Sequence, residues 1–210
     1  GALIFEDGVK LVRERGRLMK LAGEQQPGSM AAVFGLDAPV LSAICAEASV
    51  SVSGPAVVVA NDNCPGQIVI SGDDTALEIG LEMAKAAGAK RALKLAVSIA
   101  AHSPLMSTAA DSFRRAVDLT PFELPRIPII GNVKVARMET IDSIREELGN
   151  QLTQSVRWTE TIQGMRAQGV THFFELGPKD VLNGLIKRID RDATSVPINS
   201  ASALQTLIAS

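Results

Sequence analysis

Aromatic residues are scarce in this chain of 210 residues: they make up 3% of it, with no tyrosine and a single tryptophan. Proteins that stack the bases of single-stranded nucleic acid use several aromatic rings, so the composition disfavours this class. An excess of one charge is also missing, because 21 Lys and Arg residues stand against 23 Asp and Glu residues, a formal net charge of −2. We therefore expect no nucleic-acid partner.

Cysteine and histidine occur only twice each. Cys45 and Cys64 lack the spacing of a metal site, so no metal is predicted, and free thiols in a reducing compartment are the simplest account. No G-x-x-x-x-G-K-[ST] phosphate loop or G-x-G-x-x-G turn is present, and no bound cofactor is expected. No apolar run is long enough to span a membrane and no signal peptide is recognised, so we expect a cytoplasmic protein without membrane contact.

The remaining composition, 46% hydrophobic and 21% charged, is typical of a folded domain. Apolar periodicity and turn residues, including Gly23 as the end of the first helix and a turn over 61–66, divide the chain into elements. Helices are predicted at 6–22, 38–48, 75–87, 107–117, 140–152, 158–168 and 181–189. Strands are predicted at 30–36, 56–60, 67–71, 90–99, 127–130, 171–176 and 195–199.

These elements predict an α/β fold in which two parts of the chain differ in their order of strands and helices. Residues 29–99 read strand, helix, strand, strand, helix, strand, the ferredoxin-like βαββαβ order of a subdomain inserted in a larger unit. Residues 1–28 and 100–210 are assigned to that larger α/β unit. Strands alternate with helices in its second part, which indicates a parallel sheet with crossover helices.

The stretch KLAVSIAAHSPLM, residues 94–106, holds the main candidate for chemistry. We interpret it as a buried strand that ends at His102, in a Ser-Pro turn, and a histidine at the end of a strand is well placed for acid–base work. A structural histidine that caps the next helix is the alternative. Ser103 is a poor partner because neighbours on an extended chain point to opposite faces, and no G-x-S-x-G elbow is present.

Arg15 is a second candidate, on the first predicted helix. An arginine at a buried helix edge can hold a carboxylate through two hydrogen bonds, whereas a solvated surface arginine is the alternative.

The order of several motifs carries a resemblance. The helix LVRERGRLM is followed by ANDNCPGQIVISG, HSPLM, RIPIIGNV, QLTQSVRW and FFELGPKDVLNGLIKRI. In this order they resemble the malonyl-CoA:acyl carrier protein transacylases, the acyltransferase family of fatty-acid and polyketide synthesis, nearly end to end. N-x-N-x-P-G-Q-x-V-I-S-G and HSPLM are specific when they occur together.

The resemblance implies an α/β-hydrolase-like parallel-sheet core with an inserted ferredoxin-like subdomain. It implies that His102 is the general base, oriented by the backbone carbonyl of Gln151, and that Arg15 holds the free carboxylate of a malonyl group. The implied reaction moves this group from malonyl-CoA to a serine and then to the phosphopantetheine thiol of acyl carrier protein. Three further side chains are expected near the cleft between the subdomains, in a supporting role: Asn61, Asn63 and Gln67.

Two departures from the family pattern stand out. The G-H-S-L-G elbow with the nucleophilic serine is absent, so we expect the chain to lack the N-terminal part of the family and to be inactive alone. Ala101 stands before His102, where malonyl-selective polyketide domains carry phenylalanine, and the added room suggests a branched methylmalonyl substrate unless a neighbouring side chain fills it. The alternatives are a polyketide synthase acyltransferase with a broader substrate range and a non-catalytic ferredoxin-like binding module.

Overall fold

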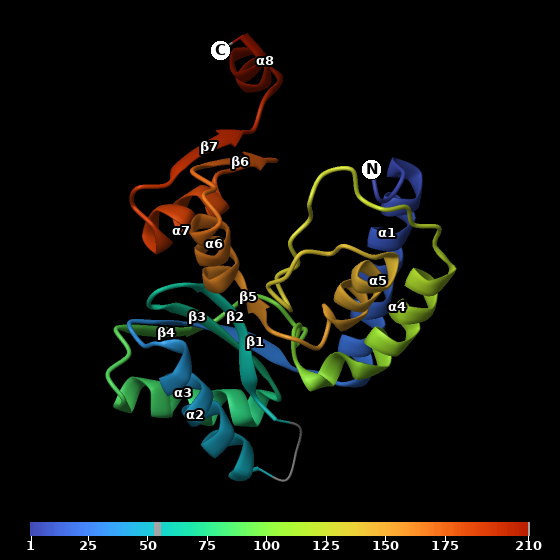
Figure 1. The fold of residues 1–210 in the computed structure, drawn as a ribbon. Coiled ribbons are helices and arrows are strands. Elements are labelled where there is room, and N and C mark those ends of the chain that lie inside the picture. The colour runs from blue at the N-terminus through green and yellow to red at the C-terminus, as the bar shows by residue number, and fades with distance from the viewer. Residues whose placement is uncertain (53–55, 210) are drawn as a thin grey trace.

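The computed structural model describes residues 1–52 and 56–209. The helices are α1 (Phe5–Gln25), α2 (Ala38–Val50), α3 (Asp74–Ala86), α4 (Ser107–Leu119), α5 (Ile141–Asn150), α6 (Trp158–Ala167), α7 (Val181–Ile189), α8 (Ala201–Ala209) and the 3₁₀ helix η1 (Pro104–Met106). The strands are β1 (Ser29–Phe34), β2 (Val58–Cys64), β3 (Gln67–Gly72), β4 (Arg91–Lys94), β5 (Val156–Arg157), β6 (His172–Leu176) and β7 (Thr194–Ile198). Figure 1 shows the β1–β4 sheet with α2 and α3, a helical group of α1, α4 and α5, and a C-terminal group around β6 and β7.

The main sheet has the strand order β4-β1-β3-β2-β5. Strands β1 to β4 pair antiparallel, and β5 joins β2 in parallel. From β1 to β4 the chain runs strand, helix, strand, strand, helix, strand, as the sequence predicts. Helices α2 and α3 lie side by side against one face of this sheet (Figure 1).

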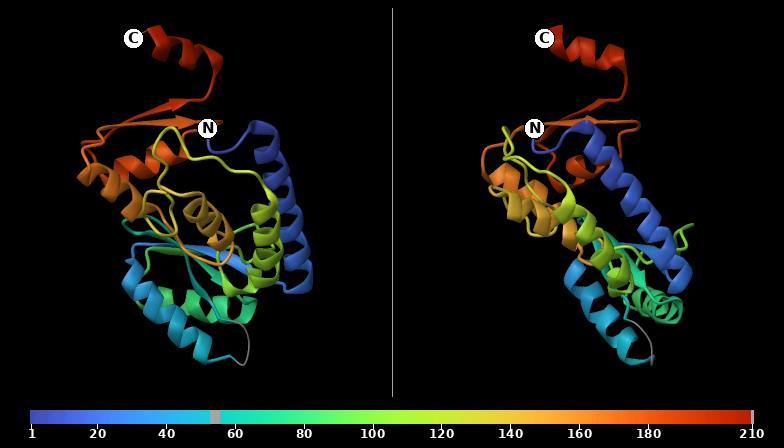
Figure 2. Two further views of the ribbon diagram at one scale, coloured as in Figure 1. Left: turned by 45° about the vertical axis from the view of Figure 1, so that its right-hand side comes forward. Right: turned by 90° about the vertical axis from the view of Figure 1, so that its right-hand side faces the viewer.

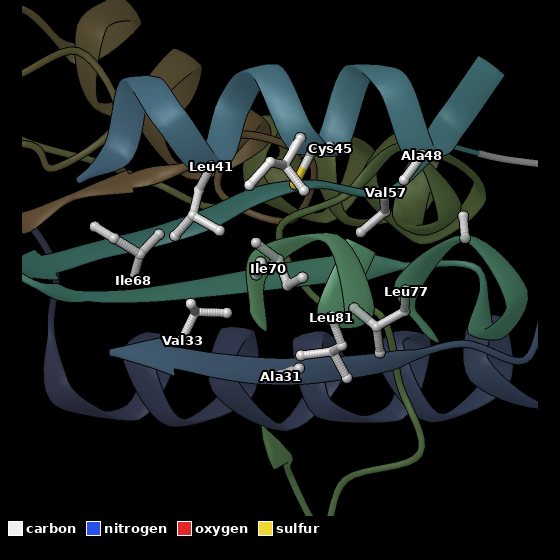
Figure 3. Packing of buried hydrophobic residues seen from close by; sticks show 13 residues of the cluster. Ala31, Val33, Leu41, Cys45, Ala48, Val57, Ile68, Ile70, Leu77 and Leu81 are labelled. Carbon is white, nitrogen blue, oxygen red and sulfur yellow. The ribbon is translucent and has the colours of Figure 1, made fainter. Parts of the chain in front are cut away.

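The core between this sheet and helices α2 and α3 follows from the side-chain periodicity of strands and that of helices. Alternate residues of a strand point to one face, while a helix turns an apolar residue inward every three or four positions. Figure 3 shows the resulting layer, in which strand side chains meet those of both helices. The fully buried members include Ala31, Val33, Ile70, Leu41, Ala48 and Leu77.

A second core joins α1, α4 and α5, which lie side by side in both views of Figure 2. Leu11 and Leu18 of α1 meet Phe113 and Val117 of α4, and Ile144 of α5 completes the cluster. This packing brings three segments that are far apart in sequence to one place. It also fixes the frame in which the candidate site lies.

The C-terminal group contains a parallel pair, β6 and β7, with α7 between them in the chain. The sequence predicted both strands and α7, but it predicted neither β5 nor α8. Strand β5 has only two residues, and α8 buries none of its side chains, so neither leaves a strong pattern. Within residues 1–52 and 56–209, no helix is long and apolar enough to cross a membrane.

The predicted strand over 90–99 is wrong in length, because β4 ends at Lys94. Its antiparallel partner β1 pairs Ala31 with Lys94 and begins at Ser29, and the backbone bond from Leu95 N to Met30 O is the last one. Beyond that point no partner strand continues, so the chain bends and Val97 is 42% exposed. His102 therefore lies in a loop, eight positions after the last residue of β4.

Three smaller predictions are also wrong. The segment 127–130 forms only the isolated bridge Ile130–Arg137, because Pro128 has no N–H to donate to a strand ladder. The predicted turn over 61–66 is largely strand: β2 continues to Cys64 through two irregular steps, which leaves only Pro65-Gly66 as the turn.

Gly23 does not end α1, which runs to Gln25 before Pro27. A Cβ at Gly23 would collide with Ile99, so this glycine permits close approach of the loop that leads to His102.

Candidate active site

His102 is placed by a tight turn rather than by a strand. Its φ of 58° lies in the left-handed region, which few non-glycine residues adopt. The next residue fixes the turn: Ser103 Oγ donates to the Ala100 carbonyl at 2.7 Å and accepts from Leu105 N at 3.3 Å. Ser103 is fully buried and caps η1, so its role is structural.

The ring of His102 lies against the end of α5. Its Nδ1 is 2.7 Å from the backbone carbonyl oxygen of Gln151, the C-cap residue of that helix. Carbonyls in the last turn of a helix have no intrahelical partner, so this oxygen is free to accept. A carbonyl cannot donate, so Nδ1 carries the hydrogen and Nε2 keeps its lone pair.

The environment favours the neutral ring. Burial lowers the pKa of His102 below its ordinary value of 6.5, the Gln151 carbonyl opposes this by raising it, and the nearby Arg15 charge lowers it again. At neutral pH the ring is therefore unprotonated. It can accept a proton at Nε2, as a general base must.

Arg15 comes from α1 and shares a cavity of about 430 Å³ with Gln151. The other walls are mostly apolar, from Leu11, Phe113 and Leu148 among others. Burial lowers the pKa of Arg15, although a guanidinium remains charged in proteins. Among the described residues none forms an ion pair or side-chain hydrogen bond with Arg15, so the cavity holds an unpaired cation.

The remaining candidates are described by their burial and by their own partners. Ala101 is buried, at 7% exposure, next to His102. Asn61 and Asn63 lie on β2, where Asn61 pairs with Val156 of β5. Gln67, on β3, accepts a hydrogen bond from Arg188 of α7. The structure thus joins His102, Gln151 and Arg15, whereas the contribution of Asn61, Asn63 and Gln67 to substrate binding stays a prediction.

One neighbour of the site was missed. The side-chain amide of Gln151 donates to Asn132 Oδ1, across a loop that the sequence marked only as the end of a strand. A Gly-Asn pair is a common turn signal, so the sequence held no sign of this contact. Across residues 1–52 and 56–209, no group of three or more His, Cys, Asp or Glu is arranged to hold a metal ion.

Comparison with known proteins adds the family. The family model described as "Acyl transferase domain" matches residues 1–205. The chain belongs to the acyl transferase domain family. Among curated relatives, the malonyl CoA-acyl carrier protein transacylase of Escherichia coli K12 is 42% identical over 204 residues, 97% of this chain and 65% of that protein. The chain thus spans about 65% of the length of this relative.

Solved acyl transferases have the same fold. The malonyl CoA-acyl carrier protein transacylase from Coxiella burnetii superposes with a TM-score of 0.93 at 40% identity, covering 100% of this chain and 65% of that one. A malonyl-transacylase in complex with its type II PKS acyl-carrier protein gives 0.92 at 39% identity, covering 98% and 66%. The α/β arrangement of this chain, a mixed sheet with helices, is therefore that of solved acyl transferases.

Proposed function

We propose that the protein transfers a malonyl group from coenzyme A to the phosphopantetheine thiol of acyl carrier protein, through an acyl-serine intermediate. One observation carries the proposal: the backbone carbonyl of Gln151 orients the ring of His102, and Gln151 also lines the cavity that contains the unpaired Arg15. The names of the relatives, malonyl CoA-acyl carrier protein transacylases, support the acyl group and the partner.

His102 would act first as base and then as acid. Nε2 of His102 takes the proton of the serine hydroxyl while the serine oxygen attacks the thioester carbonyl. The same proton then passes from Nε2 to the departing coenzyme A sulfur. In the second half the carrier thiol gives its proton to Nε2, attacks the acyl-serine ester, and the serine oxygen recovers the proton. Gln151 holds the ring in one tautomer, the role that aspartate has in a serine protease. None of the 210 residues forms a G-x-S-x-G elbow, so we place the serine outside them.

Arg15 would bind the free carboxylate of the malonyl group. A half-buried guanidinium without a partner gains two charge-assisted hydrogen bonds when a carboxylate enters. An acetyl group leaves the cation unpaired, so it binds less favourably. The chemistry needs no cofactor, because coenzyme A and phosphopantetheine arrive with the substrates.

The architecture completes the proposal. We assign residues 29–99 to a ferredoxin-like subdomain, with 1–28 and 100–210 in an α/β-hydrolase-like unit; the strand order β4-β1-β3-β2 with both helices on one face supports the first assignment. We place the protein in the cytoplasm, which agrees with two cysteines that are free and buried.

Ala101 bears on substrate range. If the space beside this buried methyl is open to the acyl group, the protein also accepts methylmalonyl-CoA, as a polyketide acyltransferase would. Competition between the two thioesters, compared in the wild type and in Ala101→Phe, tests this. Equal selectivity in both proteins would remove Ala101 as a determinant.

The decisive experiment uses the full-length protein with malonyl-CoA and holo-acyl carrier protein, with the carrier mass as readout. We expect malonylated carrier with holo-protein and none with apo-protein, which lacks the thiol. Acetyl-CoA should be a poor donor. Failure of the wild type to malonylate the holo-carrier would overturn the proposal. Measurable transfer by the 210-residue chain alone would overturn the placement of the serine outside this chain.

A further inference from the structure

Glu147 is a buried carboxylate that the mechanism above does not use. It lies on α5 and is 5% exposed, although acidic side chains are rarely so buried unless they are paired. Its partners are backbone groups: Val133 N donates to Oε1 at 2.8 Å and Lys134 N donates to Oε2 at 3.3 Å. Both oxygens therefore hold one loop, residues 131–134.

Gly131 shows that this loop is shaped around the carboxylate. A Cβ at this position would collide with the carboxylate of Glu147, so only glycine lets the two approach. On its other side the loop is held by β5, where Arg157 N donates to the Asn132 carbonyl at 2.8 Å. The loop is thus fixed between α5 and β5, and Asn132 itself makes the backbone attachment to β5.

Asn132 connects the loop to the site. Its Oδ1 accepts a hydrogen bond from the Gln151 side-chain amide, and the Gln151 carbonyl accepts one from His102 Nδ1. Glu147 and Gln151 are four residues apart, about one turn along α5, so the loop spans both on one side of the helix. A continuous set of contacts therefore runs from Glu147 through Asn132 and Gln151 to the ring of His102.

We propose that Glu147 is a positioning residue for the acyl-transfer reaction. Its carboxylate sets the 131–134 loop, the loop sets Asn132, and Asn132 fixes the residue whose carbonyl holds His102 with Nε2 free. The proposal rests on the proposed function, in which His102 is the base. It adds a buried acidic group and a loop to the reaction machinery without any direct contact with substrate.

Glu147→Ala in the full-length protein tests the proposal through turnover and its pH dependence. In this variant the His102 ring is less well oriented, so kcat should fall by about tenfold or more. KM for malonyl-CoA should change little, because Arg15 is untouched. The Gln151 carbonyl raises the pKa of His102, and the facing charge, Arg15, lowers it. Loosening the carbonyl contact therefore moves the acidic limb of the pH profile to lower pH.

Three further variants sharpen the test. Glu147→Gln keeps one acceptor for the loop and should recover part of kcat. Gly131→Ala displaces the same carboxylate and should reproduce Glu147→Ala. The matched control is Asp142→Ala on the same helix, because the Asp142 side chain is 96% exposed and pairs at 4.0 Å with Arg145, which lies outside the 131–134 loop; kcat and the acidic limb should stay as in the wild type.

Nitrogen-15 NMR of the His102 ring gives a readout that needs no turnover. The wild type should show the Nδ1–H tautomer, and Glu147→Ala should show a mixture. If Glu147→Ala does not fold, Asn132→Ala replaces it, since it cuts the contact to Gln151 and leaves the loop on Glu147. An unchanged tautomer, kcat and acidic limb would overturn this inference, whereas a wild type without malonyl transfer would instead overturn the proposed function.

Discussion

His102 owes its proposed reactivity to two neighbours that act on different properties of its ring. The Gln151 carbonyl fixes the hydrogen on Nδ1, and burial, helped by Arg15, keeps the ring neutral. A base works only when it is unprotonated, so activity falls as the pH drops through its pKa. Because that pKa is lowered, the midpoint of the acidic limb should lie below pH 6.5.

The measurement is the pH dependence of kcat/KM for malonyl transfer. His102→Gln should lower kcat by about 10³-fold, since it removes the acid–base group and keeps a polar side chain of similar size. A midpoint at or above pH 6.5 in the wild type would contradict the assignment.

In the proposed function, Arg15 affects both the binding of the malonyl group and the pKa of His102. Arg15→Gln should lower kcat/KM for malonyl-CoA by about 100-fold, the scale of hydrogen bonds to a charged group, and spare acetyl-CoA. It also removes a charge that lowers the pKa of His102, so the acidic limb should move to higher pH. Arg17→Gln is the matched control, because Arg17 is exposed and pairs with Glu14. Equal losses in the two variants would refute a specific role for Arg15.

Among the elements, the two helices that pack on the main sheet, α2 and α3, differ in the hydrogen bonding of their N-cap residues. Asp73 caps α3, and its Oδ1 accepts from Thr75 N at 2.9 Å and Ala76 N at 3.2 Å. Asp37 holds the same position on α2 but its side chain makes no capping bond. Asp73→Ala should lower the free energy of unfolding by about 1 kcal/mol.

Asp37→Ala should change the free energy of unfolding by less than about 0.5 kcal/mol, because no bond is lost. Urea unfolding of both variants, followed by circular dichroism, makes the comparison. Equal effects would mean that the helix N-termini are stabilised by charge alone and not by the capping bond.

Helices were predicted more accurately than strands for a physical reason. A helix makes its hydrogen bonds within itself, so its ends depend on local residues such as Asp73 and Thr140. A strand ends where its partner strand ends. Because β4 runs antiparallel to β1, the last residue of β4 pairs near the first residue of β1. The sequence of residues 90–99 alone holds no record of that partner.

At the scale of the whole molecule, apolar side chains remain exposed around the N-terminal end of α1. Ile4, Phe5, Val9 and Val12 are 51–82% exposed and line one hollow of about 530 Å³. A contiguous patch of this kind favours association in water. The 210-residue chain should therefore bind the dye ANS and self-associate.

The double variant Phe5→Ser and Val12→Ser should reduce ANS fluorescence and self-association in light scattering, with little change in unfolding free energy because both side chains are already exposed. Val50→Ser is the control, since Val50 is 87% exposed on α2, away from this hollow. A double variant that behaves like Val50→Ser would show that the patch does not drive association.

Local sequence patterns specify helices α1 to α7 and the strand–helix order of residues 29–94, and they mark His102 and Arg15 as candidates for chemistry. These depend on local periodicity, capping and residue type. Contacts between distant segments set where β4 ends, bring Asn132 to Gln151, and let Glu147 hold the loop that carries Asn132. His102 and Gln151 are 49 positions apart, and such contacts exist only once α1, α4 and α5 have packed around their shared core.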